Sequence, residues 1–334
     1  MSTEHPFAQF IRIIGRGPNL SRPLDEEEMY EAAQMIARGD VEPLQLGAFL
    51  CILRVRTEVP GEGAGFVRAM RDSYKAPEGA PTVDLDWATY SGKKRQLPWY
   101  LLSAFLLAQN GITICMQGTE GHTDDRLFSS DALSQLGVKL AGSMEEAAEQ
   151  IKATNFAYLP LRNFMPRLQE IIELKPILGV RSPVNTFARM LNPFNAAHEL
   201  QTVFHPNYRD VHRDTAQLLG QKHMAVFKGE GGEAERRPHK PVMVQYLHDG
   251  QKSEEMWPAL VSEDAFYKDD NLDVARLPKI WNGEASDEYG EAAIIGTAAY
   301  VLRLMGRANS PEEAIEQATK MWNTRNRAEL IKAA

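Results

Sequence analysis

The stretch TVDLDWATYSGKKRQLPWYLLSAFLLAQNG, Thr82 to Gly111, contains a strand-like run, a loop and an apolar helical run. TVDLDW has the character of a short strand, and the helical run ends at Gly111. Many folds bind a phosphate where a loop leads from a strand into a helix N-terminus. Here the loop has one glycine, Gly92, followed by Lys93, Lys94 and Arg95. It is therefore either an anion site of unusual composition or a solvated turn.

Strand-like and helix-like runs alternate after this loop, which predicts an α/β sheet covered by helices. Before it, three helical segments precede KAPEGAP, Lys75 to Pro81, a Pro/Gly-rich linker. We therefore expect a small all-helical domain in residues 1–75 and a larger α/β domain in residues 76–334. The α/β domain should contain a central, mainly parallel sheet flanked by helices. Helices from about residue 165 to 198 are expected to return to the helical domain.

Composition limits the classes of partner. The net charge of −8 attracts neither nucleic acid nor an acidic membrane to the chain as a whole, so an anion site must be a local cluster. Cys51 and Cys115 lie in apolar runs outside any metal-ligand spacing, which predicts a reduced cytoplasmic protein. No run approaches the roughly 20 apolar residues that span a membrane, so we expect no membrane association.

Two further charged groups have alternative interpretations. Arg209 and Arg213 share a helix face, and several lysines and arginines follow them up to Lys240. This basic group is either surface charge paired with nearby carboxylates or one wall of a cleft shared with the loop. Glu230, Glu233 and Glu235 form a glycine-rich acidic turn, which is either a loop at a strand end or a weak metal site.

Two longer strings carry a resemblance to a known family. LGVRSPVNTFARMLNPF, Leu178 to Phe194, is similar to the motif LG-x-RT-x-N-x-x-GPL-x-NP, and GDVEPLQLGAFLCILRVRTEVPGEGAGFVRAM, Gly39 to Met70, to a helical-domain signature. Both motifs are typical of the anthranilate phosphoribosyltransferase family, which has the nucleoside phosphorylase/phosphoribosyltransferase fold. The resemblance implies a cleft between the two domains and a homodimer through the helical domain. It also implies phosphoribosyl pyrophosphate and Mg²⁺ as ligands.

The chain departs from this family at the substrate motifs. YSGKKRQ replaces the family's loop GTGGDG, so the glycines that let a backbone approach pyrophosphate are missing. After the next strand Gly118 is kept, but Thr119 and Glu120 replace an Asn and an Arg. The family's acidic metal pair becomes Ala234–Glu235, which leaves Glu235, with Glu230, as a weak Mg²⁺ site. Lys175 aligns with an arginine that contacts anthranilate.

These departures resemble a branch of the family that is described as binding nucleic acid without sequence preference. Nine residues are expected to contact phosphate groups: Ser91, Gly92, Lys93, Lys94, Arg95, Arg126, Arg181, Arg209 and Arg213. A substrate-like cleft is expected at Gly118, Thr119, Lys175 and Asn185. No catalytic residue is assigned.

Three functions therefore stay open. The leading hypothesis is a homodimer that binds DNA or RNA non-specifically. The alternative is a glycosyltransferase that moves a phosphoribosyl or ribosyl group to a nitrogen acceptor, as in the tryptophan pathway. A third is an inert scaffold that binds another protein through its helical domain.

Overall fold

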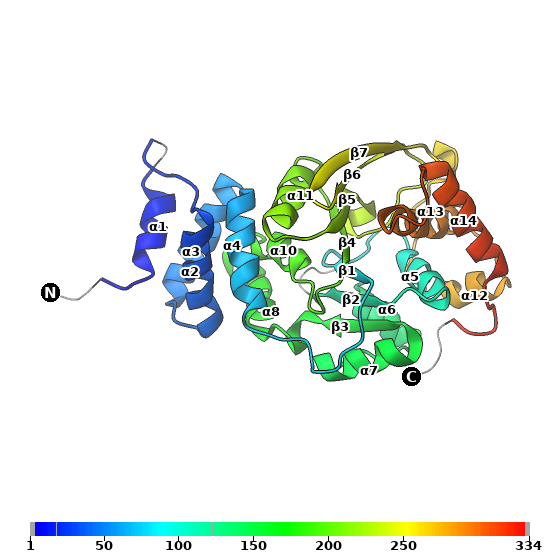
Figure 1. Ribbon diagram of the computed structural model, residues 1–334, viewed down its shortest axis with the longest axis horizontal. Coiled ribbons are helices and arrows are strands. Elements are labelled where there is room, and N and C mark those ends of the chain that lie inside the picture. Colours follow the sequence, from blue (N-terminus) through cyan, green and yellow to red (C-terminus); the bar gives the residue numbers. More distant parts are fainter. Residues whose placement is uncertain (1–3, 18, 122, 124, 331–334) are drawn as a thin grey trace.

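The computed structural model describes residues 4–17, 19–121, 123 and 125–330, with a helical part at one end and an α/β part at the other (Figure 1). The helical part consists of α1 (Ala8–Gly15), α2 (Glu26–Arg38), α3 (Pro43–Arg56) and α4 (Pro60–Arg71). α2 begins with a capping box, in which Asp25 and Glu28 each accept the other's backbone N–H at 2.9 Å. Prolines in the first turn start α3 and α4.

A seven-stranded sheet forms the centre of the α/β part, in the order β3-β2-β1-β4-β5-β6-β7. The strands are β1 (Leu85–Thr89), β2 (Ile114–Gly118), β3 (Phe156–Pro160), β4 (His198–Val203), β5 (His223–Lys228), β6 (Val242–His248) and β7 (Gln251–Trp257). The first five strands run parallel, and β6 and β7 are antiparallel to their neighbours. The expected fold class, a helical domain with a mainly parallel sheet, is confirmed.

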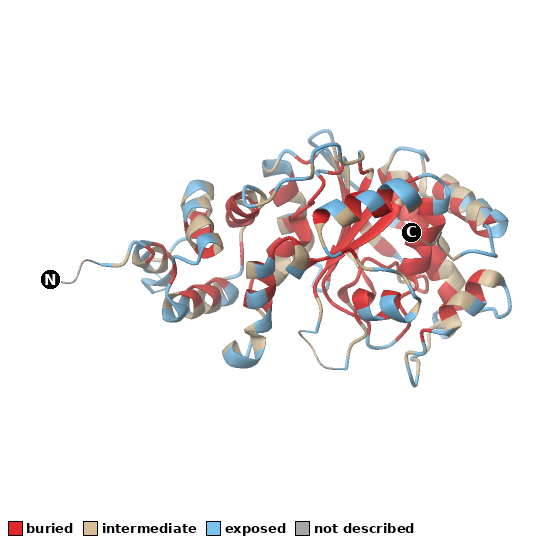
Figure 2. Ribbon diagram, turned by 90° about the horizontal axis from the view of Figure 1, so that it is seen from below, coloured by how far each residue is buried: buried red, intermediate tan, exposed pale blue. Residues whose placement is uncertain are grey.

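Helices cover both faces of the sheet, so every residue of β1, β2 and β3 is buried (Figure 2). The helices that follow β1 in the chain are α5 (Tyr100–Gln109), α6 (Ser129–Gln135), α7 (Met144–Thr154), α8 (Pro166–Glu173), α9 (Lys175–Leu178), α10 (Val184–Phe187), α11 (Tyr208–Leu218), α12 (Arg276–Asn282), α13 (Glu288–Leu304) and α14 (Pro311–Thr324). Short 3-10 turns are η1 (Leu161–Asn163), η2 (Ala188–Met190), η3 (Glu230–Gly232) and η4 (Glu263–Ala265). Alternate strand residues enter different cores: Trp87 packs with α5 and α13, whereas Ala88 packs on the side of the helical part.

Close packing joins the helical part to the sheet. Side chains from α2 to α4 share one core with residues 164–196. α4 also approaches α11 so closely that a Cβ at Gly63 would lie 2.6 Å from the Thr215 hydroxyl oxygen. Arg71 of α4 donates to the Met190 carbonyl at 2.6 Å and pairs with Glu199 of β4 at 3.1 Å. The junction is thus a packed interface that places α3 and α4 beside the strand ends.

Neither cysteine forms a disulfide, and Cys115 is buried in β2. Within the described ranges, no helix has the length and apolar character needed to cross a bilayer.

Candidate anion-binding site

The loop between β1 and α5 lies at the carboxyl ends of the parallel strands. Ser91 comes after β1, Phe204 after β4 and Gly229 after β5, and these three strands are neighbours in the sheet. Ligands of open α/β sheets bind at this edge, because the loops that leave neighbouring strands meet there. The candidate site is therefore built from the loop, the segment after β4 and the turn after β5.

A buried carboxylate of the chain occupies the backbone donors of the loop. One oxygen of Glu233 accepts the Ser91 N–H at 2.7 Å and also the Gly92 N–H. Gly92 has φ +68°, a left-handed conformation that glycine adopts without strain and that turns the two N–H groups the same way. Glu233 has no exposed surface, and its burial raises its pKa against the opposing effect of Arg189. The donors that an external phosphate would use are thus already satisfied.

A second carboxylate neutralises the first cation of the KKR triplet. The Lys93 ammonium forms an ion pair with Glu235, and the two side chains are 1% and 0% exposed. The other Glu235 oxygen accepts the Tyr100 N–H at 2.9 Å, at the start of α5. Burial raises the pKa of Glu235, and Lys93 opposes that shift. Lys93 was expected to contact an external phosphate; instead its charge is satisfied inside the protein.

These contacts also decide the fit of a magnesium ion. Both Glu235 oxygens have protein partners, and Glu230 contributes one further carboxylate that is 8% exposed. Among the described residues, no group of three or more His, Cys, Asp or Glu side chains can hold a metal ion. The expected weak Mg²⁺ site at Glu230 and Glu235 does not fit this arrangement.

Arg126 ties the loop to the turn after β5. Its guanidinium donates to the carbonyls of Ser91 at 3.0 Å, Gly92 at 2.9 Å and Gly231 at 3.2 Å. Lys93 and Leu127 exchange two backbone hydrogen bonds of 2.8 Å beside it. Arg126 is half-buried, and burial lowers its pKa. Arg126, which was expected to contact a phosphate, thus holds the loop in shape through backbone carbonyls.

The remaining cations of the loop line a basic pocket of about 260 Å³. The pocket's charged lining residues are Lys93, Lys94, Arg95, Arg126, Lys228, Glu230 and Arg237. Lys94 and Arg95 are exposed, and Lys228 and Arg237 are partly exposed. Within the described part of the chain, these four exposed or partly exposed cations form no ion pair. Phe204, which is 56% exposed, also lines this pocket.

A second cavity of about 160 Å³, the arginine pocket, shares Phe204 with the basic pocket. Its cationic lining residues are Arg54 of α3, Arg181 and Arg189, so the helical part contributes to it. Ser91 and Asn185, two of the predicted residues, also line it. Arg54 and Arg189 were not predicted, although a charge inside the apolar run NTFARMLNPF was a usable signal.

The other predicted residues lie outside the lining of these two pockets. Lys175 and Arg181 both donate to the Thr123 hydroxyl, at 3.2 and 3.1 Å, so Lys175 is a neighbour of the arginine pocket. Thr119 is fully buried and donates to Gln169 at 2.8 Å, and Gly118 packs against Thr89.

Arg209 and Arg213 do not share a cleft with the loop. Arg209 donates to the carbonyls of Pro206 and Met243 at 3.2 and 3.1 Å. Arg213 pairs with three carboxylates of α11 and β7: Asp210 at 2.9 Å, Asp214 at 3.1 Å and Glu254 at 3.6 Å. The alternative interpretation, surface charge paired with neighbouring carboxylates, describes Arg213.

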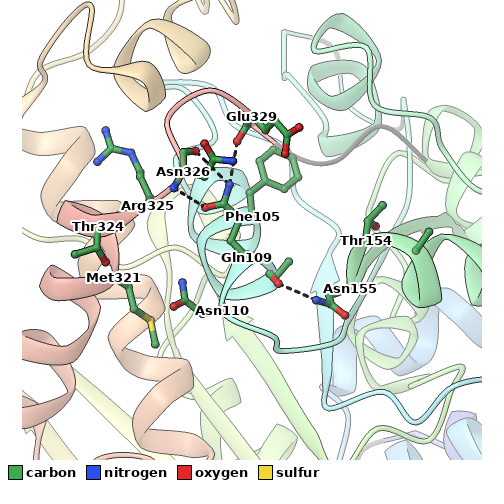
Figure 3. A pocket seen from close by; sticks show the side chains of 12 residues that line it. Phe105, Gln109, Asn110, Thr154, Asn155, Met321, Thr324, Arg325, Asn326 and Glu329 are labelled. Atoms are coloured by element: carbon green, nitrogen blue, oxygen red, sulfur yellow. Dashed lines mark hydrogen bonds between the residues drawn. The ribbon is translucent and has the colours of Figure 1, made fainter.

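A cavity of about 290 Å³ lies at the opposite end of the sheet, near the carboxyl end of α5 (Figure 3). Gln109 donates there to the carbonyls of Asn326 and Glu329, at 3.3 and 2.9 Å. Arg325 donates to the carbonyls of Ile280, Trp281 and Trp322. The polar groups of this cavity serve to hold the C-terminal segment against α5.

Comparison with known proteins identifies the family. The helical bundle domain of a glycosyl transferase family matches residues 8–74, and the a/b domain of the same family matches residues 100–325. The helical domain and the mainly parallel sheet thus match the anthranilate phosphoribosyltransferase fold. The chain belongs to this glycosyl transferase family, as the resemblance to anthranilate phosphoribosyltransferases predicted.

Two relatives and two solved structures illustrate the relationship. The chain is 26% identical to an uncharacterized protein of Aquifex aeolicus, over 89% of this chain and 93% of the relative. It is 28% identical to an anthranilate phosphoribosyltransferase of Burkholderia mallei, over 70% of this chain and 68% of that protein. The anthranilate phosphoribosyltransferase of Thermus thermophilus has a TM-score of 0.75 at 23% identity, covering 96% of this chain and 94% of the other. That of Saccharomyces cerevisiae, in complex with PRPP and Mg, has a TM-score of 0.78 at 14% identity, covering 98% and 96%.

Proposed function

We propose that this protein binds the phosphate backbone of nucleic acids, without sequence preference, through the basic pocket. The supporting observation is that Lys94, Arg95, Lys228 and Arg237 gather at one strand edge without ion pairs among the described residues. Non-specific binding requires several such phosphate contacts and little else. The exposed ring of Phe204 beside these cations offers a base a stacking surface.

The contacts of the loop favour this function over pyrophosphate binding of the family type. A pyrophosphate seat needs backbone donors and a metal, but Glu233 holds the N–H groups of Ser91 and Gly92. Lys93 is likewise held by Glu235. The cations that stay available are long, exposed side chains, which suit an extended polyanion better than a closely enclosed substrate.

A salt titration of binding tests this proposal. We expect a labelled single strand to bind at about 50 mM salt and to weaken steeply as salt rises. The variant Lys94→Ala/Arg95→Ala removes two phosphate contacts, so the slope of log K against log salt should fall by about 1.4. Lys152→Ala/Lys320→Ala is the matched control, because it removes two exposed cations from α7 and α14. Absence of affinity for single- and double-stranded DNA and RNA at low salt would overturn the proposal.

Transfer of a phosphoribosyl or ribosyl group to a nitrogen acceptor is the second candidate function. Family membership and the names of the relatives favour it. In such a reaction the bond from the sugar C1 to pyrophosphate breaks, a C–N bond forms, and the nitrogen loses a proton. The cations of the basic pocket would have to stabilise the leaving pyrophosphate, because both oxygens of Glu235 already have protein partners.

Thermal shifts with phosphoribosyl pyrophosphate, with and without Mg²⁺, separate the two functions. A ligand at 100 times its Kd stabilises the native state by about 2.7 kcal/mol, which is a measurable shift. A clear shift, followed by release of pyrophosphate with a nitrogen acceptor, would establish the transferase. A shift in neither condition, together with salt-dependent binding of a single strand, would leave nucleic-acid binding.

The expected homodimer is also part of this proposal. Leu44 and Val55 lie on α3 and are 88% and 84% exposed, and Ile177 of the neighbouring α9 is 80% exposed. A second copy of the chain that packs on this side of α3 and α9 would bury these apolar side chains. Light scattering should therefore report a dimer, and Val55→Glu should yield monomers if this face is the interface.

A further inference from the structure

We infer that the arginine pocket binds a terminal phosphate monoester of a nucleic-acid strand whose following phosphates occupy the basic pocket. This inference rests on the proposed nucleic-acid binding. The two pockets are adjacent, because Phe204 lines both. One strand can therefore contact the two pockets with consecutive phosphate groups.

Unsatisfied donors and acceptors at the base of the arginine pocket indicate a ligand. Arg189 is 8% exposed, and its Nη2 donates to the Ser91 hydroxyl at 2.7 Å. Its Nη1 is buried and has no hydrogen-bond partner among the described residues. Ser182 Oγ, also buried and unpartnered, lines the same pocket. Buried polar atoms are rarely left unpaired, so an anion that accepts from these groups would remove a substantial cost.

The charges around the pocket also favour a bound anion. Arg54, Arg181 and Arg189 line one small cavity. Burial lowers the pKa of Arg181, and the like charges of Arg126, Arg189 and Arg54 lower it further. Two carboxylates are nearby. Glu233 opposes part of this positive charge while it accepts the loop N–H groups. Burial raises the pKa of Glu58, next to Tyr208, which disfavours its charged form. A bound anion would relieve the repulsion that remains among the arginines.

Size and depth favour a monoester over a backbone diester. The pocket of about 160 Å³ is smaller than the roughly 300–1,000 Å³ of sites for drug-sized ligands, so it suits a single phosphate group. Its base is recessed, since Ser91, Ser182 and Arg189 are all less than 10% exposed. A diester carries chain on both sides and cannot reach such a base without folding the strand into the pocket. A terminal monoester has one substituent and carries a charge of about −1.5 to −2 at neutral pH.

Matched oligonucleotides test this inference on the full chain. Single strands of one sequence are compared by fluorescence anisotropy with a 5′-phosphate, a 3′-phosphate or hydroxyl groups at both ends. At least one phosphorylated strand should bind about tenfold more tightly than the hydroxyl strand, as expected for charge-assisted hydrogen bonds. Arg181→Ala and Arg189→Lys should remove this advantage, so that each variant binds the phosphorylated and the hydroxyl strands with equal affinity. Far-UV circular dichroism and thermal melts verify that both variants fold, and Arg181→Ala, at a less buried position, remains informative if Arg189→Lys does not.

Each outcome has a defined meaning. Equal affinity of the three strands overturns the terminal-phosphate inference and leaves nucleic-acid binding intact. An advantage that persists in Arg181→Ala also overturns it, because the monoester is then bound elsewhere. Inorganic phosphate should compete with the phosphorylated strand more strongly than with the hydroxyl strand. If no strand binds but inorganic phosphate stabilises the wild type and not Arg181→Ala, the ligand is a free small phosphate, and both proposals fail.

Discussion

The buried part of the β1–α5 loop and the basic pocket beside it both contain cations, but only those of the loop are paired with carboxylates of the protein. In the loop, Lys93 and the N–H groups of Ser91 and Gly92 are satisfied by Glu235 and Glu233. One residue further along, Lys94 is exposed and has no ion pair among the described residues. Adjacent cations in one triplet thus have different roles: Lys93 holds the fold together, whereas Lys94 is available to a ligand.

Breaking the buried ion pair should have the largest effect. Lys93→Met leaves the Glu235 carboxylate buried without its partner, which should lower the free energy of unfolding by about 3–5 kcal/mol. Lys94→Met removes a cation of the same type from the surface and should change it by less than about 0.5 kcal/mol. Urea unfolding of both variants measures the difference. Similar losses in the two variants would show that Lys93 is not specially buried.

Acidification should have the next largest effect, through a histidine of the arginine pocket. His212 lines this pocket, and its Nδ1–H donates to the amide oxygen of Gln201 at 2.7 Å. Burial lowers the pKa of His212 to about 3. Its folded pKa lies below the unfolded value near 6.5, so the unfolded state binds the extra proton between these values. Above pH 6.5 His212 is neutral in both states and does not lower the free energy of unfolding. As pH falls from 6.5 towards 3, the free energy of unfolding decreases, by about 2 kcal/mol between pH 7 and pH 5.

His212→Gln provides the control for this pH dependence. The variant should lose the histidine contribution, so its free energy of unfolding should fall less than that of the wild type between pH 7 and pH 5. Parallel curves for the two proteins would contradict the assignment to His212.

Glu233→Ala tests whether the loop can still hold a phosphate group. The substitution frees the N–H groups of Ser91 and Gly92, which should raise the affinity for pyrophosphate about tenfold. Isothermal titration with pyrophosphate measures the change, and Glu230→Ala, which removes a carboxylate that lines the basic pocket, is the control for lost negative charge. An equal gain in the two variants would show that the effect is general electrostatics and not the opened loop.

The fold class could be predicted because its strands and helices have clear local patterns. β1, β2 and β3 are short apolar runs, and α2 has acidic residues at its start. β4 was missed because its sequence HELQTV is largely polar. Glu199 and Gln201 are buried there only because Arg71, Asn192 and His212 satisfy them. β7 was missed because QKSEEMW is an exposed edge strand with charged side chains.

The candidate site was predictable in position but not in the state of its charges. The order of strand, loop and helix placed the loop at the correct edge of the sheet. However, Lys93 meets Glu235 and Ser91 meets Glu233 across more than 140 residues of chain, and no local pattern contains such pairs. The contact of Arg189 with Ser91 likewise spans 98 residues; the charge inside an apolar run marked Arg189 locally, but nothing local indicated its partner.

The smallest expected effect belongs to Arg213, a cation that is paired and lies outside both pockets. Asp210, Asp214 and Glu254 already neutralise it, so a phosphate would have to compete with three carboxylates. Arg213→Ala should therefore change the affinity for a single strand by less than about twofold and leave the salt slope unchanged, whereas Lys94→Ala/Arg95→Ala lowers both. A lower slope in Arg213→Ala would mean that the strand extends over α11 and that paired cations exchange partners on binding. In that case, whether a cation already has a carboxylate partner would not decide whether it binds phosphate.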